Sequence, residues 1–290
     1  MEGSSDHTRL MNIFLGLSMN IPKWPNTLKQ LGYEVEIIEG DIPEANPDLI
    51  FTSRRLDHSL IIECKSKNTE EKQINKYLQL KFDPSLLIKR GIVNKVIHQH
   101  RYMLDIAFTS FFDISHDKLL IKNGIPFLYV IKGNSNKIKI IEKRISDFTK
   151  NELNRKFPIQ IPEDSRPPYL LYPFDPKEKE IFVISILTEL LNFSLKGKST
   201  FTMEELLKSI FKNIWEVIGD HKKKEFRNIG TRLLEKIKKE ELKPYIKKED
   251  NVWHVILKKD NKSYQAFQNK CNVIIKSLKE KLKQKTLKEI

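Results

Sequence analysis

The residues best suited to chemistry are two carboxylates and a lysine in an apolar hairpin. Asp48 precedes the run Leu-Ile-Phe-Thr-Ser, and fourteen residues separate it from Glu63, which is followed by Cys64 and Lys65. Residues two apart in a strand point to the same face, so Glu63 and Lys65 share a face and Cys64 points to the other. A hairpin centred near positions 56 and 57 sets position 48 across from about 64 or 65. We therefore expect Asp48 to lie beside Glu63 and Lys65 at one end of a sheet.

Two carboxylates and an ammonium within apolar strands are too costly to serve only as packing residues. A divalent cation resolves this cost, because proteins bind Mg²⁺ through one or two carboxylates together with water and phosphate oxygens. Such a cation polarises a phosphodiester and stabilises the departing oxygen, while a neighbouring lysine positions or helps to deprotonate the attacking water. The pattern therefore predicts metal-dependent phosphodiester hydrolysis. The alternative is a surface hairpin with an ordinary Glu–Lys ion pair.

The motif Pro47-Asp48, followed after the same fourteen residues by Glu63-Cys64-Lys65, resembles that of the PD-(D/E)xK nuclease superfamily. This superfamily includes restriction endonucleases, recombination nucleases and RecB-like exonucleases. The resemblance implies that Asp48 and Glu63 are ligands of Mg²⁺ or Mn²⁺, and that the backbone carbonyl of Cys64 also contacts the metal. It further implies that Lys65 is the catalytic lysine. The resemblance covers roughly residues 23–80.

The helix expected after this hairpin carries a second match. Gln73 and Tyr77 are one turn apart and share a helix face, and RecB-like nucleases carry a similar Gln-xxx-Tyr element that faces the active site. The resemblance implies that Gln73 hydrogen-bonds near the metal, the water or the nucleic acid backbone, and that Tyr77 contributes to placing the nucleic acid. The superfamily often adds an acid on an earlier helix or strand. Glu34, Glu36 and Glu39 are the candidates, of which Glu36 is preferred.

Periodicity and turn residues predict the elements that hold these side chains. We expect a core segment rather than a signal peptide over 11–19, and a mixture of strands and helices after it. Such a mixture predicts an α/β fold with a central mixed sheet, and the resemblance implies that this sheet is restriction-endonuclease-like and flanked by helices. The expected helices cover 24–32, 69–79 and much of 93–112, and the expected strands cover 33–39, 49–53, 60–65, 126–132 and 137–142.

A proline-rich stretch marks a domain boundary, because the sequence over 157–177 cannot sustain a helix. We expect helices over 178–195, 202–218 and 222–241, then a β-hairpin turning at 249–251. Three helices followed by a hairpin resemble a winged-helix domain. The predicted order is a nuclease domain over 1–160, a linker over 161–177, a winged-helix-like domain over 178–260 and a basic helix over 261–290.

The positive charge is concentrated in this second half. The chain has a formal net charge of +14, and the part from Pro176 onward holds 27 Lys and Arg against 16 Asp and Glu. A cation-rich face attracts phosphate backbones, and recognition helices put their first residues on bases and phosphates. The alternative is a packing or protein-partner domain with a solvated basic face. The expected nucleic-acid contacts are Lys222, Lys223, Lys224, Arg227 and Arg232 on the third helix, and Lys247 and Lys248 near the wing.

These observations predict a magnesium-dependent DNA endonuclease of a restriction, phage-defence or transposition system. A non-catalytic DNA-binding or assembly subunit and an RNA-directed nuclease are the alternatives. The sequence has no Gly-rich nucleotide-binding loop, so any ATPase would be a separate protein. A transposase or a defence-system subunit is another possible partner, and the chain could also form a homodimer. No apolar run approaches the roughly 18 residues that span a bilayer. Two distant cysteines favour a reducing, cytoplasmic setting.

Overall fold

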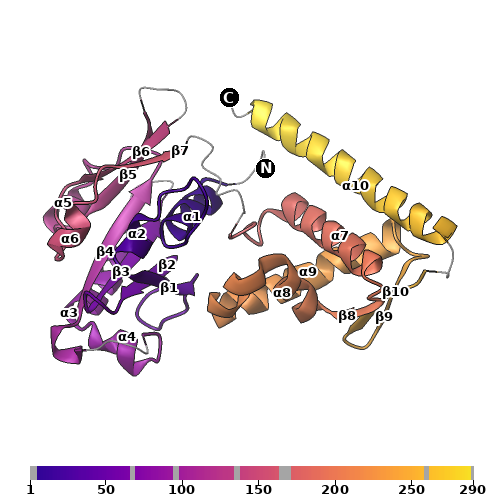
Figure 1. Cartoon of the computed structure of the whole chain (residues 1–290), viewed down its shortest axis with the longest axis horizontal. Coiled ribbons are helices and arrows are strands. Elements are labelled where there is room, and N and C mark those ends of the chain that lie inside the picture. Colours follow the sequence, from indigo (N-terminus) through magenta and orange to yellow (C-terminus); the bar gives the residue numbers. More distant parts are fainter. Residues whose placement is uncertain are drawn as a thin grey trace. The chain divides into compact units, whose positions relative to one another are not determined.

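The computed structural model describes residues 5–65, 69–93, 98–133, 138–162, 171–257 and 261–288 (Figure 1). These residues form two compact units. The sheet unit consists of Asp6–Tyr172 together with Val217–Lys222, and the helical unit consists mainly of Pro173–Glu216 and Lys223–Ile290. Within the described ranges, no helix is long and apolar enough to cross a membrane.

A seven-stranded mixed sheet is the centre of the sheet unit (Figure 1). The spatial order of the strands follows the chain, and β3, β4 and β5 run parallel whereas the other neighbours are antiparallel. The expected α/β class with a mixed sheet is therefore confirmed. The strands are β1 (Tyr33–Ile38), β2 (Leu49–Ser53), β3 (His58–Cys64), β4 (Met103–Ser110), β5 (Phe127–Lys132), β6 (Ile138–Arg144) and β7 (Ile159–Pro162).

Helices cover the strands that carry the motif. The helix α3 (Glu71–Phe82) packs Ile74, Tyr77 and Leu80 into an apolar cluster with side chains of β2, β3 and β4. The helix α1 (Asp6–Leu17) is buried from Leu10 onward and contacts β3, which confirms the expected core segment. The remaining elements are α2 (Thr27–Gln30), α4 (Ser85–Lys89), a 3-10 turn (Gln99–Arg101), α5 (Lys118–Lys122) and α6 (Asn151–Asn154).

The predicted helix over 93–112 is wrong, because this segment contains β4. Leu104, Ile106 and Phe108 belong to the apolar cluster beside α3, while Asp105 and Ala107 are buried as well. These two sets alternate along the segment, which is the pattern of a strand, and the helix prediction overlooked it. The edge strand β7 was not predicted. Residues 94–97 of the predicted helix and 163–170 of the predicted linker lie outside the described residues.

Three buried polar side chains form hydrogen bonds at the end of the sheet opposite Glu63. The hydroxyl of Tyr33 lies 2.6 Å from Nδ1 of His58, and Nε2 of His58 lies 3.1 Å from Oδ2 of Asp105. Burial lowers the pKa of His58. A neutral ring then accepts from Tyr33 and donates to Asp105. Although burial alone would raise the pKa of Asp105, hydrogen bonds from His58 and Thr149 lower it overall.

The hydrogen bonds among Tyr33, His58 and Asp105 predict that the protein loses stability in acid. Because the pKa of folded His58 lies below the usual 6.5, the unfolded state binds the extra proton first as the pH falls below about 6.5. We expect the wild type to lose up to about 1.4 kcal/mol of unfolding free energy per pH unit there, relative to His58→Gln, which cannot titrate. Urea denaturation at pH 7.5 and 5.5 measures this difference, and an equal pH dependence in both proteins would contradict it.

The helical unit contains an aromatic core and a small sheet. Rings of Phe174, Phe182, Phe211 and Phe226 contact one another. The antiparallel strands lie in the order β8-β10-β9. The predicted helices and hairpin are confirmed, whereas β8 was not predicted. The elements are α7 (Lys179–Leu195), β8 (Thr200–Thr202), α8 (Met203–Phe211), a 3-10 helix (Lys212–Val217), α9 (Asp220–Glu240), β9 (Ile246–Glu249), β10 (Val252–Val255) and α10 (Asn261–Lys288).

Candidate metal centre

The hairpin of β2 and β3 brings Asp48 and Glu63 to the same end of the sheet. The strands pair from Ser53 with His58 to Leu49 with Ile62, so position 48 continues opposite position 63. The predicted partner was 64 or 65, and the difference arises because the turn over 54–57 is centred earlier than expected. Asp48 nevertheless contacts Cys64, the residue after Glu63, because the backbone N–H of Cys64 donates to Oδ2 of Asp48 at 2.6 Å.

Glu63 is the centre of a buried hydrogen-bond network that contains three of the predicted residues. Its side chain is only 6% exposed, and its Oε1 lies 3.0 Å from the ammonium of Lys65. The ammonium of Lys65 donates to Oε1 of Gln73, and Nε2 of Gln73 donates to Oε1 of Glu63, both at 2.6 Å. The hydroxyl of Tyr77 donates to Oε2 of Glu63. Lys65, Gln73 and Tyr77 therefore fix the orientation of one carboxylate.

This environment makes Glu63 hard to ionise. Burial, followed by the nearby Asp48 carboxylate, raises the pKa of Glu63 to about 7, although Lys65 and Tyr77 act in the opposite direction. Glu63 therefore holds a proton more readily than an ordinary glutamate does. Burial also raises the pKa of the Cys64 thiol, so this thiol stays neutral and is no nucleophile.

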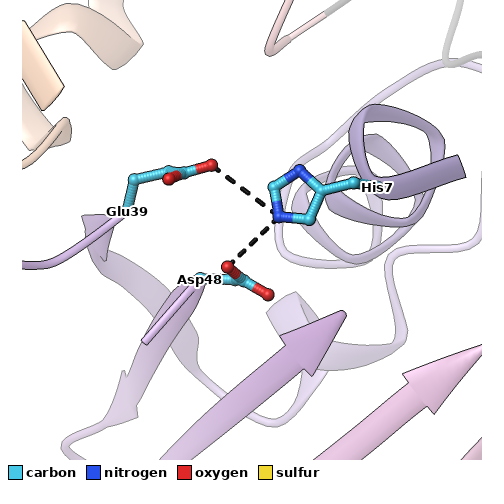
Figure 2. Close-up of side chains that lie close together, drawn as sticks. All are labelled: His7, Glu39 and Asp48. Atoms are coloured by element: carbon cyan, nitrogen blue, oxygen red, sulfur yellow. Dashed lines mark ion pairs between the residues drawn. The ribbon is translucent and has the colours of Figure 1, made fainter. Parts of the chain in front are cut away.

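A second group of side chains surrounds Asp48 (Figure 2). Nε2 of His7, in the first turn of α1, lies 3.1 Å from Oδ1 of Asp48 and 3.7 Å from Oε1 of Glu39. Glu39 directly follows β1 and Asp48 directly precedes β2, and the backbone N–H of Glu39 donates to the carbonyl of Asp48 at 2.8 Å. We call His7, Glu39 and Asp48 the acidic cluster. Their potential ligand atoms all lie within 4.8 Å of one another.

The acidic cluster fits a divalent cation. Carboxylate oxygens suit Mg²⁺ and Mn²⁺, whereas an imidazole nitrogen suits transition metals, so this donor set favours Mn²⁺ over Mg²⁺. Asp48 joins the two groups, because its Oδ1 faces His7 and its Oδ2 accepts from Cys64. Glu63, the other predicted carboxylate ligand, already contacts Lys65, Gln73 and Tyr77, which occupy three of its roughly four acceptor sites. A contact from the Cys64 carbonyl stays a prediction.

The sequence did not point to His7, and it preferred Glu36 to Glu39. Glu36 is not a member of the acidic cluster, whereas Glu39 is. Glu34 instead pairs with Lys29 at 3.0 Å. A histidine near the start of an apolar helix is the signal that the sequence offered for His7, but only the packing of α1 against the sheet reveals its partners.

A cavity of about 180 Å³ adjoins the Glu63 network. Gln73 and Tyr77 form part of its wall, so the cavity and the network share two side chains. Lys72 and Lys76, one turn apart on α3, are exposed at its edge. Tyr77 itself is buried with its hydroxyl on Glu63, and we revise its expected role from contacting nucleic acid to orienting that carboxylate.

The cations predicted to hold nucleic acid differ in their exposure. The prediction for Lys222 is wrong, because its side chain is buried against Glu39, with its ammonium 3.1 Å from Oε2. Lys224 and Arg232 are exposed on α9. Arg232 donates to the carbonyl of Asn228, Lys223 to the carbonyl of Glu216 and Arg227 to Glu204. Lys247 pairs with Glu249, and Lys248 pairs with Glu235 and lies over the ring of Trp253.

Comparisons with known proteins match both halves of the chain. Residues 6–172 match a family model described as the MJECL32 domain, and residues 175–290 match a domain of unknown function (DUF8601). The chain is also similar to "Uncharacterized protein MJECL32" of Methanocaldococcus jannaschii, with 30% identity over 251 residues. That match covers 74% of this chain and 56% of the relative, so the chain spans about half of the relative's length. No solved structure matches the chain significantly.

Proposed function

Because the chain belongs to the MJECL32 domain family, whose description names no activity, we propose a function from its own residues: metal-dependent cleavage of DNA. One observation carries the proposal. At the open end of the β2–β3 hairpin, Asp48 belongs to a group of potential metal ligands and also adjoins β3, which contains Glu63 and is followed directly by Lys65. This combination matches the chemistry expected of a PD-(D/E)xK nuclease on a restriction-endonuclease-like fold.

The proposed roles follow from the contacts. A bound divalent cation supplies the positive charge that stabilises negative charge developing on a phosphodiester. Lys65 places its ammonium beside the reacting phosphate and water, and its orientation is set by Glu63 and Gln73. Tyr77 fixes the remaining oxygen of Glu63. Asp48, with His7 and Glu39, provides the ligands.

The helical unit is proposed to hold the nucleic acid. Its order of helix, strand, two helices and a hairpin resembles that of a winged-helix domain, which supports this proposal, and most of the excess positive charge lies in this part of the sequence. Lys224 and Arg232 are exposed and suited to phosphate contacts. Such an enzyme suits a cytoplasmic restriction, phage-defence or transposition system, in which a separate ATPase, transposase or defence subunit is a partner.

The test is incubation of the full chain with supercoiled plasmid, linear duplex, single-stranded DNA and RNA. Each substrate is incubated with Mn²⁺, with Mg²⁺ or with EDTA. We expect broken DNA strands with either cation, more with Mn²⁺, and none with EDTA. Cleavage that continues undiminished in EDTA would contradict a metal-dependent site, and cleavage of RNA alone would replace DNA as the substrate.

The cavity beside Gln73 predicts a path for the phosphate backbone. Replacing Lys72 and Lys76 together by alanine removes two exposed cations without touching the Glu63 network. We expect KM for DNA to rise by roughly tenfold and kcat to change little. The slope of the logarithm of the binding constant against the logarithm of the salt concentration should decrease in magnitude by about 2. Lys118 and Lys122, equally spaced and exposed on α5, provide the matched control. An equal effect of both double variants would remove the cavity from the path.

A further inference from the structure

A short segment from the second half of the sequence lies in the sheet unit. Val217–Lys222 belongs to this unit, although the residues on both sides of it belong to the helical unit. Ile218 forms a parallel bridge with Ile38, and the backbone N–H of Gly219 donates to the carbonyl of Ile38 at 2.8 Å. The segment therefore extends the sheet beside the end of β1, where Glu39 follows.

Gly219 makes this close approach feasible. A Cβ atom on residue 219 would lie 2.3 Å from the backbone oxygen of Glu39, which is closer than any side chain allows. The absence of a side chain lets the two backbones meet. The chain thus brings the first turn of α9, and with it Lys222, to the carboxylate of Glu39.

Lys222 directs its ammonium to the acidic cluster. Its side chain is 9% exposed, and Nζ lies 3.1 Å from Oε2 of Glu39. Oε1 of the same carboxylate lies 3.7 Å from His7, which in turn contacts Asp48. The positive charge of one lysine is therefore built into the group of side chains that fits a divalent cation.

A lysine in this position opposes a metal ion. In the metal-free protein its charge offsets that of the partly buried Glu39 carboxylate, whose side chain is 16% exposed. A dication held by Glu39 would lie close to the ammonium, and like charges within a few ångströms repel strongly where water is scarce. The contact thus stabilises the metal-free state more than the metal-bound state.

We propose that Lys222 is an internal competitor of the metal ion, which lowers the affinity of the acidic cluster for divalent cations. The inference rests on the proposed metal site and adds a regulatory contact to it. It also makes residues 217–222, which lie outside the matched segment 6–172, a part of the centre. Because coupling is reciprocal, any ligand that draws this segment away from β1 tightens metal binding.

The test titrates the full-length protein with Mn²⁺ alone, by calorimetry and without nucleic acid. Lys222→Met keeps the length of the side chain and removes its charge. We expect the Kd for Mn²⁺ to fall by at least about tenfold. Lys222→Arg should stay close to the wild type, and so should Lys224→Met, which removes an exposed charge two residues further along the same helix. Unchanged or weaker binding by Lys222→Met would overturn the proposal.

Two further variants keep this result interpretable. Lys222→Gln removes the charge but retains a hydrogen-bond donor for Glu39, and we expect it to bind Mn²⁺ more tightly, as Lys222→Met does. It replaces the methionine variant if a thermal melt shows that the latter does not fold. Asp48→Asn distinguishes a failure of the metal site from a failure of the competitor role of Lys222. If Asp48→Asn leaves Mn²⁺ binding unchanged, the metal site itself is wrong. If it abolishes binding while neither neutral variant of Lys222 tightens binding, only the competitor role falls.

Discussion

Replacing Asp48 by asparagine is expected to weaken Mn²⁺ binding by at least about 100-fold and to abolish DNA cleavage. Asp48 contacts both His7 and the strand that carries Glu63. Asparagine has nearly the same shape and keeps an oxygen that can accept from the Cys64 backbone. The variant therefore removes the charge without removing the hydrogen bond that holds the hairpin end.

The measurements are Mn²⁺ titration by calorimetry and cleavage of labelled duplex DNA, with a thermal melt to establish folding. Asp41→Asn is the control, because Asp41 is an exposed carboxylate in the same β1–β2 connection and is not a member of the acidic cluster. Loss of cleavage with unaltered Mn²⁺ affinity would show that Asp48 acts in some other way than as a ligand. Full activity would remove it from the site.

The second large effect is expected at Lys65, and it should separate catalysis from metal binding. Lys65→Met removes the ammonium that contacts Glu63 and Gln73, so we expect the single-turnover cleavage rate to fall by about 10²–10⁴-fold. Because Lys65 is not a member of the acidic cluster, Mn²⁺ affinity should change by no more than a few-fold. Without this ammonium, the pKa of Glu63 should rise further, since Lys65 is one of the groups that lower it.

Single-turnover kinetics at saturating Mn²⁺, with a pH profile, measure both consequences of the Lys65 change. The control is Lys122→Met, which removes an exposed lysine on α5. A Lys65→Met enzyme with the rate of the wild type would leave the lysine without a catalytic role. A large loss of Mn²⁺ affinity would instead make Lys65 a part of the metal site.

The local part of the site was predictable because it depends on short-range geometry. Strand alternation alone places Glu63 and Lys65 on one face, and one helical turn separates Gln73 from Tyr77. In the structure these four residues form one hydrogen-bond network. Even here the register of the hairpin differs from the prediction, because the position of a four-residue turn is not fixed by the alternation of its strands.

The distant part of the site was not predictable in this way. His7 reaches Asp48 only because α1 packs on the sheet, which no spacing in the sequence expresses. Glu39 rather than the preferred Glu36 lies in the acidic cluster for a local reason. The pairing of β1 with β2 shifts between Val35 and Ile37, and such a bulge reverses the alternation beyond it.

Lys222 and β4 show two further limits of sequence reasoning. A run of lysines at the start of a helix is typical of a solvated face, but the docking of Gly219 on β1 buries the first of them. In the segment Met103–Ser110, Leu104, Ile106 and Phe108 alternate with smaller or polar residues, but both sets are buried because β4 lies in the middle of the sheet. In both cases tertiary contacts decide which side chains are buried.

The central claim is that the acidic cluster of His7, Glu39 and Asp48 is a divalent-cation site beside Lys65. Anomalous diffraction from a crystal of the protein soaked in Mn²⁺ tests it most directly, because the signal locates the ion without any assumption about activity. We predict a strong anomalous peak within coordination distance of Nε2 of His7 and of carboxylate oxygens of Glu39 and Asp48. A peak elsewhere with none at this cluster, or a cluster that stays empty at saturating Mn²⁺, would contradict the account.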